Sequence, residues 1–186
     1  MITTTHVVVN ALAVKIPTLK KVISKPKAFI FGGLAPDMFL YIASIVMFSY
    51  YSLTTNLATD EIFDYIYNDL FFNNIYWLIG QNILHAPFVL IGLYFAAKKF
   101  KKYKHVLQSF ALGAGLHTVI DVFTHHNDGP LVLFPFNLSY RFSSPISYWD
   151  PAHYGNILAP IDLTITVVGG LILVILSTKQ RRAKSS

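Results

Sequence analysis

The chain has 186 residues, of which 54% are hydrophobic and 13% are charged, with a net charge of +6 at pH 7. Soluble domains usually contain roughly 25% charged residues, so we expect this chain to be embedded in a lipid bilayer. Its length suits a single membrane-embedded domain over residues 1–186 and excludes a separate soluble enzyme module. The absence of cysteine excludes disulfides, thiolate zinc ligands and cysteine nucleophiles. The N-terminus lacks the basic region and cleavage site of a secretory signal, so we expect Met1 onward to be retained.

Four apolar stretches approach the length of about 20 residues that a helix needs to cross about 30 Å of hydrocarbon. They cover residues 28–52, 76–97, 106–124 and 157–177. The first contains Gly32, Gly33 and Pro36, which predict a broken element whose helix proper begins at Pro36. Residues 3–14 predict a short amphipathic helix that dips inward from Lys15, with a helix lying on the membrane surface as the alternative. The expected fold is all-α, a polytopic membrane helical bundle of about four transmembrane helices plus this N-terminal amphipathic helix.

The basic residues fall into three clusters beside these stretches. The clusters are Lys15, Lys20, Lys21, Lys25 and Lys27, then Lys98, Lys99, Lys101, Lys102 and Lys104, and finally Lys179, Arg181, Arg182 and Lys184. Only Arg141 lies elsewhere. If all four stretches cross the membrane, the three clusters lie on the same side of it. Cytoplasmic loops of membrane proteins are enriched in Lys and Arg. We therefore expect a multi-pass protein of the cell (inner) membrane, with both termini cytoplasmic and its basic residues on anionic lipid headgroups rather than on nucleic acid.

His117, Asp121 and His125 recur every four residues within an otherwise apolar run. At 3.6 residues per turn their side chains would fall on one stripe of a helix. Imidazole and carboxylate groups are common ligands of zinc and similar ions, so the stripe predicts a buried metal site. A structural ion pair or a proton relay is the alternative, although three ionisable residues on successive turns exceed what packing requires. Either His125 or His126 could be the ligand, and Asp128 is typical of a turn former in Asn-Asp-Gly-Pro.

Other ionisable residues inside the apolar stretches are functional candidates, because charged groups are costly at membrane depth. Measured along ideal helices at ~1.5 Å per residue, Asp37, His85 and His117 each lie about 14–17 Å from the end of their span. They can therefore meet near the midplane. On an inward-dipping N-terminal helix, His6 would reach a depth of ~14 Å by the same rise.

Several of these residues also have purely structural explanations. His85 could bond to a backbone carbonyl, one of which Pro87 frees one turn back. Asp37 could cap the N-terminus of its helix, where a carboxylate accepts backbone N–H groups. Helix capping after Pro160 is the preferred explanation for Asp162.

The order of these motifs resembles a known family, the membrane-bound metal-dependent hydrolases, which are distantly similar to zinc-dependent phospholipases C. The shared elements are Thr5-His6, Gly33-Leu-Ala-Pro-Asp37, Leu84-His85-Ala86-Pro87, and His117-x-x-x-Asp121 followed by His125 or His126. The match covers about residues 5–130. The chain departs from the family pattern at Gln81 and Asn82, where a further polar residue or histidine often stands, and at Ala86, where serine is common.

The resemblance implies a metal-dependent hydrolase that uses a metal-activated water. Asp37 would be a bridging ligand or the general base, and the other metal ligands would be His6, His85, His117, Asp121 and His125. Six candidate ligands exceed the four of one tetrahedral zinc, so one or two zinc-type ions are implied. A site at membrane depth among aromatic-rich helices favours an amphiphilic or lipid-linked phosphoester as substrate.

The alternative function is a non-catalytic integral membrane protein whose buried His/Asp cluster is structural or handles protons or metal ions. A transporter would usually be larger and would often show paired repeats, which are absent here. Neither a P-loop nor a Gly-x-Ser-x-Gly motif occurs, which disfavours nucleotide-driven and serine-hydrolase mechanisms. Residues 148–154 could cover an outward mouth of the site, with His153 as a loop residue. His125 argues for an outward opening and His6 for an inward one.

Overall fold

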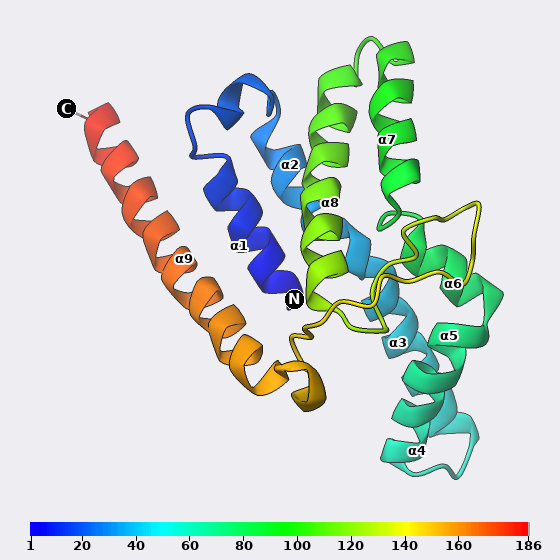
Figure 1. Cartoon of the computed structure of the whole chain (residues 1–186). Helices are drawn as coiled ribbons and strands as arrows, with labels where there is room; N and C mark the ends of the chain where they lie inside the picture. The colour runs from blue at the N-terminus through cyan, green and yellow to red at the C-terminus, as the bar shows by residue number, and fades with distance from the viewer. Residues whose placement is uncertain (186) are drawn as a thin grey trace.

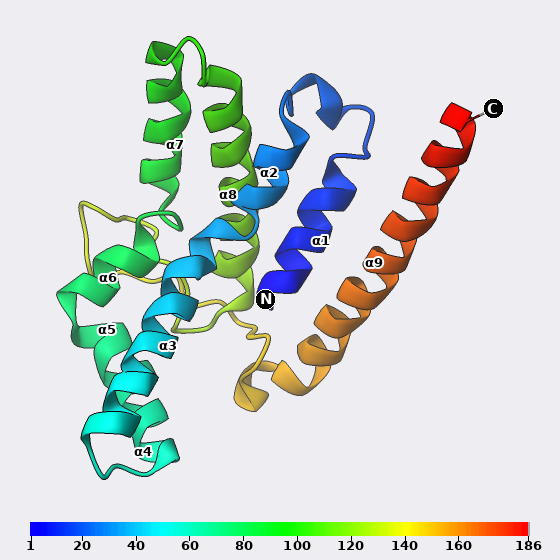
Figure 2. The same cartoon turned by 180° about the vertical axis from the view of Figure 1, so that it is seen from behind.

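The structure, a computed structural model, describes residues 1–185 (Figures 1 and 2). Its elements in chain order are α1 (Thr3–Ala13), η1 (Leu19–Lys21), α2 (Pro26–Gly32), α3 (Ala35–Thr54), α4 (Thr59–Asp64), η2 (Tyr65–Leu70), α5 (Phe71–Asn73), α6 (Ile75–Asn82), α7 (Pro87–Ala96), η3 (Ala97–Lys99), α8 (Lys104–Thr124), η4 (Pro151–His153) and α9 (Gly155–Ser185). None of the described residues forms a strand. The predicted all-α class is confirmed.

Within the described chain, two helices are long and apolar enough to cross a membrane by themselves, α8 over Lys104–Thr124 and α9 over Gly155–Lys179. Two bent pairs also qualify if each pair is one span. These are α2 with α3, bent by 46°, and α6 with α7, bent by 54°. The four units coincide with the four apolar stretches of the sequence. The helical bundle is therefore confirmed with two to four candidate spans, judged by length and composition.

The bend between α2 and α3 falls at the Gly-Gly pair that the sequence singled out. A side chain at Gly32 would place its Cβ 2.4 Å from the carbonyl oxygen of Phe110 in α8. A side chain at Gly113 of α8 would place its Cβ 2.0 Å from the carbonyl oxygen of Phe29 in α2. Both positions need glycine because the backbones of the two helices are in contact. The break leaves Asp37 in the first turn of α3.

The second apolar stretch, predicted as one span over residues 76–97, is not a continuous helix. α6 ends at Asn82 and α7 begins at Pro87. Proline lacks the N–H that a continuing helix needs, and its ring clashes with the preceding turn, so the helix is interrupted there. His85 lies in the break, and its ring contacts His117 of α8.

α1 lies between α9 on one side and the α2–α8 pair on the other (Figures 1 and 2). His6 and Asn10, one turn apart, are both fully buried. Asn10 Nδ2 donates to the carbonyl oxygens of Phe29, at 2.9 Å, and Gly113, at 3.1 Å. α1 therefore turns its polar face into the bundle, and His6 is not solvated as the surface-lying alternative required.

Asp162 caps α1 and not its own helix, which corrects the sequence interpretation. α9 begins at Gly155 and continues through Pro160, so Asp162 lies well inside it. The Asp162 carboxylate accepts the backbone N–H of Ile2 at 2.8 Å. This contact holds the start of α1 against α9.

The three basic clusters lie at one end of the molecule (Figure 1). The chain after α1, the connection between α7 and α8, and the C-terminal end of α9 all reach that end. α4, α5 and the segment 125–154 lie away from it. The lysine-rich end of the molecule is thus separated from these loops.

Candidate metal centre

Four ionisable side chains that are distant in sequence meet inside the bundle. Asp37 comes from the first turn of α3, His85 from the α6–α7 break, and His117 and Asp121 from α8. One ligand atom of each residue lies within 4.8 Å of those of the other three. His117 and Asp121 are buried and His85 is 9% exposed. No second group of this kind occurs among the residues that the structure describes.

The two histidines of this cluster face each other through their Nε2 atoms. His85 Nδ1 lies 2.6 Å from the Gln81 carbonyl oxygen, and His117 Nδ1 lies 2.9 Å from that of Gly33. Because a carbonyl oxygen can only accept, each Nδ1 carries the proton and each neutral ring keeps a lone pair on Nε2. The two Nε2 atoms are 3.1 Å apart. Two lone pairs so close repel each other unless a cation or a proton lies between them.

The sequence offered a hydrogen bond from His85 to a backbone carbonyl as an alternative to metal binding. In the structure this hydrogen bond leaves His85 free to act as a metal ligand through Nε2. A metal-ligating histidine usually donates its other ring N–H to a carbonyl or carboxylate, which fixes the orientation of the ring. His85 and His117 both have this arrangement.

Two carboxylates complete the donor set. Asp37 Oδ1 lies 3.4 Å from the Nε2 atoms of both His85 and His117. Asp121 Oδ2 lies 2.9 Å from His117 Nε2 and 3.6 Å from His85 Nε2. Asp37 Oδ2 accepts the Thr3 hydroxyl, so both oxygens face side chains of other segments and do not cap α3. Two imidazole nitrogens and two carboxylate oxygens suit zinc.

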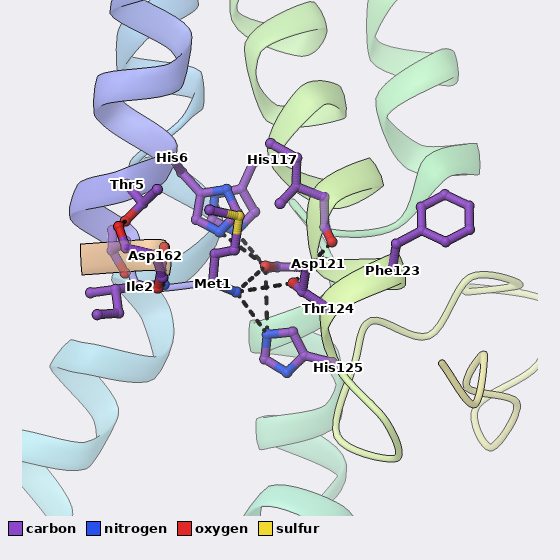
Figure 3. Close-up of polar contacts among 12 residues, drawn as sticks. Met1, Ile2, Thr5, His6, His117, Asp121, Phe123, Thr124, His125 and Asp162 are labelled. Atoms are coloured by element: carbon purple, nitrogen blue, oxygen red, sulfur yellow. Dashed lines mark hydrogen bonds and ion pairs between the residues drawn. The ribbon is translucent and has the colours of Figure 1, made fainter. Parts of the chain in front are cut away.

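Asp121 also joins the cluster to the N-terminal segment (Figure 3). Its Oδ1 lies 2.9 Å from His6 Nε2 and 3.0 Å from the Met1 amine. The buried His6 ring stacks on His117 with centroids 3.7 Å apart. The contact of His6 with Asp121 lacks hydrogen-bond geometry, and neither nitrogen of His6 has a hydrogen-bond partner within the described chain. Such a buried imidazole is costly unless something else satisfies it.

His125 lies beside the cluster but not on the helical stripe that the sequence predicted. α8 ends at Thr124, and His125 has an extended backbone with φ −122° and ψ 128°. Its Nε2 is 3.5 Å from Asp121 Oδ1 and its Nδ1 is 3.1 Å from Asp128 Oδ2. Its contact with Asp121 therefore depends on the turn that follows the helix.

Asp128 does more than form the turn. Its Oδ2 also accepts the Trp149 indole N–H at 2.8 Å. Burial acts to raise the pKa of the Asp128 carboxyl, but the contacts with His125 and Trp149 hold it below its usual value. The turn after α8 is thereby joined to the 148–154 segment.

His126, the other histidine left open by the sequence, points elsewhere. Its Nδ1 lies 2.7 Å from the Ser144 carbonyl oxygen, and its ring stacks on His153 at 3.5 Å. His153 in turn lies 2.7 Å from Asp150 Oδ2. By position, His125 adjoins the cluster, whereas His126 and His153 belong to the loop.

The three residues at which the chain departs from the family pattern are buried, and the two amides among them bond to backbone groups. Gln81 Nε2 donates to the Phe71 carbonyl oxygen at 2.7 Å. Asn82 Oδ1 accepts the N–H of Leu131 at 2.7 Å. Ala86 is fully buried beside Leu131. These residues attach α6 to its neighbours instead of adding ligands.

A cavity of about 580 Å³ lies beside the cluster. Asp37, His85 and Asp121 form part of its wall. Its aromatic lining consists of Tyr41, Tyr67, Phe71, Phe72, Tyr148 and Trp149. Sequence reasoning had assigned no role in the site to Thr3, which bonds to Asp37, or to Arg141, which also lines the cavity. Arg141 did carry a signal, because it is the single basic residue outside the three clusters.

An all-helical bundle with two histidines and two aspartates, largely buried beside a cavity, has the donor chemistry of a helical metalloprotein. The chain belongs to the zinc-dependent phospholipase C family, whose family model matches residues 5–155. No curated protein and no solved structure matches the chain significantly. The resemblance to zinc-dependent phospholipase C is thus confirmed, and the match continues past residue 130 into the loop that contains Arg141. Family and cluster together support a zinc-dependent hydrolase.

Proposed function

We propose that this protein is a membrane-embedded zinc hydrolase, formed by one domain, that cleaves a phosphoester of an amphiphilic or lipid-linked substrate. The observation that carries the proposal is the meeting of Asp37, His85, His117 and Asp121 beside a cavity large enough for part of such a molecule. Membership of the zinc-dependent phospholipase C family supports both the metal and a lipid phosphoester.

The residues of the cluster divide the work of hydrolysis between them. A zinc ion held there would lower the pKa of a coordinated water to ~7 and so supply a nucleophile at neutral pH. His85 and His117 would hold the ion through Nε2, since their Nδ1–H groups are fixed on backbone carbonyls. Asp37 would act as ligand or general base, taking a proton at Oδ1 while the Thr3 hydroxyl fixes Oδ2.

His6 and His125 extend the donor set at the second oxygen of Asp121, Oδ1. Both lie within 3.5 Å of Asp121 Oδ1, which His117 and His85 do not use. We therefore propose them as additional ligands, so that the donor set would suffice for two ions. Pairs of metal ions are common in enzymes that cleave phosphoesters.

We also propose that the bundle crosses the inner membrane of the cell with its lysine-rich end at the cytoplasm. The four candidate spans and the exposed apolar side chains of α9 support burial in lipid. The enrichment of Lys in cytoplasmic loops supports the orientation. The loops that line the cavity lie away from the lysine-rich end, so a substrate would enter from the extracytoplasmic side.

The proposal is tested by metal analysis and hydrolysis assays on the detergent-purified protein. We expect near-stoichiometric zinc in the wild type and zinc-dependent hydrolysis of a short-chain phosphatidylcholine. His117→Ala combined with Asp121→Ala should lose both. His105→Ala is the matched control, because it removes an exposed histidine of the same helix.

Two results would contradict the proposal. Equal, negligible metal in wild type and double variant would leave the cluster as a structural or proton-handling element. Stoichiometric zinc without hydrolysis of any phosphoester supplied would favour a non-catalytic membrane protein.

A further inference from the structure

Arg141 is the one Lys or Arg among the residues that line the cavity. Its guanidinium carbon lies 5.2 Å and 5.4 Å from the ring centroids of Phe71 and Phe72. Nη1 donates to the carbonyl oxygen of Gly129. Nη2 is buried and has no hydrogen-bond partner within the described chain. Leaving a charged donor buried and unpaired is costly, so this nitrogen needs an acceptor that the described residues do not supply.

The nearby acidic residue, Asp128, forms no ion pair with Arg141. Asp128 directs Oδ2 to His125 and Trp149. None of the ion pairs in the described part of the chain includes Arg141. Burial lowers the pKa of Arg141 to about 10, and the charge of Asp128 works in the opposite direction. The guanidinium therefore stays positively charged at neutral pH.

Gly129 connects Arg141 to the metal centre. A Cβ on Gly129 would lie 3.1 Å from His125 Cβ and 3.8 Å from the Asp121 carbonyl oxygen. Gly129, whose carbonyl oxygen accepts the hydrogen bond from Nη1, is therefore packed against the end of α8, next to the cluster. Arg141 faces the cavity that Asp37, His85 and Asp121 also line.

We propose that Arg141 binds a phosphate oxyanion, the phosphoryl group of the substrate, in this cavity. A guanidinium is planar and presents parallel N–H groups that match two phosphate oxygens. The Phe71 and Phe72 rings lie beside the guanidinium, and Nη2 is the buried donor without a partner among the described residues. This inference rests on the proposed function and deepens it, because the phosphoester would be held between Arg141 and the metal centre.

The test compares Arg141→Gln and Arg141→Lys with wild type in the zinc-loaded, detergent-solubilised full chain. The probes are inorganic phosphate, measured by titration calorimetry, and a short-chain phosphatidylcholine, measured by hydrolysis. Loss of one charge-assisted hydrogen bond predicts phosphate binding weaker by about 10- to 100-fold in Arg141→Gln, with KM for the lipid raised by a similar factor. Arg141→Lys should recover part of both losses, because it restores the charge without the planar fork.

Zinc content and melting temperature show whether Arg141→Gln is still folded. Lys98→Gln is the matched control, because Lys98 also lies over an aromatic ring, 4.8 Å from the Phe95 centroid, but does not line the cavity. It should bind phosphate like the wild type. Equal losses of phosphate affinity in Lys98→Gln and Arg141→Gln would overturn the inference, since they would show an effect of the net charge of the protein and not of a specific site.

The outcomes separate this inference from the proposed function. If lipid is hydrolysed but Arg141→Gln changes neither phosphate affinity nor KM, the inference fails and the hydrolase stands. If no lipid is hydrolysed but phosphate binding depends on Arg141, the oxyanion site stands and the hydrolase fails. A loss with both probes identifies the lipid headgroup phosphate as the ligand. A loss with inorganic phosphate alone supports the oxyanion site with free phosphate as its ligand.

Discussion

The carboxylate of Asp162 accepts the backbone N–H of Ile2 at 2.8 Å, although the two residues are 160 positions apart. Asp162 is only 2% exposed. An N-terminal cap normally comes from the residue that precedes the helix, whereas this one comes from a different helix. The contact fixes the start of α1 and, one turn later, the position of His6 beside Asp121.

Asp162→Ala is therefore expected to lower the free energy of unfolding by about 1–2 kcal/mol, as removal of a helix cap does, and to weaken zinc binding through His6. Asp162→Asn keeps an acceptor oxygen and should stay near the wild type. Thermal unfolding in detergent and zinc titration measure the two effects. If Asp162→Ala and Asp162→Asn behave alike, Asp162 does not stabilise the protein by accepting the N–H of Ile2.

Gly113 and Gly115 form a matched pair on α8. A Cβ at Gly113 would lie 2.0 Å from the Phe29 carbonyl oxygen, whereas one at Gly115 would meet nothing within 4 Å. Gly113→Ala should destabilise the protein by about 1–3 kcal/mol through overpacking. Gly115→Ala should stabilise it by up to about 1 kcal/mol, because alanine favours helix. Melting temperatures that shift in the same direction would contradict the close contact of α2 with α8.

Asp37→Asn separates catalysis from metal binding. The amide oxygen can still face His85 and His117, but the side chain can no longer take a proton. We expect hydrolysis of a short-chain phosphatidylcholine to fall by about 10²- to 10⁴-fold, the usual contribution of a general base, with zinc content retained. Asp64→Asn, at an exposed acidic residue of α4, is the control. Loss of zinc together with activity would instead make Asp37 chiefly a ligand.

His125 and His126 are neighbours in sequence with different surroundings. His125→Ala removes a side chain 3.5 Å from Asp121 Oδ1 and should weaken zinc binding at least about tenfold, as loss of a ligand or its supporting contact does. His126→Ala removes a ring that contacts Ser144 and His153 and should leave zinc affinity unchanged. Competition with a zinc chelator measures both. The reverse order would show that the loop rearranges to bring His126 to the metal.

Much of the fold could be predicted from local sequence. The four apolar stretches, the break at the Gly-Gly pair and the pairing of His117 with Asp121 are periodic or short-range features. The inward face of α1 could also be anticipated, because His6 and Asn10 lie one turn apart. The resemblance to the phospholipase C family rested on the order of such motifs.

The depth estimate placed Asp37, His85 and His117 at one level, but only the tertiary structure decided which side chains are in contact. Asp37, His85 and Asp121 converge because two helices break and because Gly32 and Gly113 let α2 and α8 touch. Arg141 reaches the same cavity through the turn at Gly129. Hydrophobic periodicity determines which face of a helix is buried, but it carries no information about the partner of that face. The partner is determined by breaks, close contacts and loops, which act between residues up to 161 positions apart.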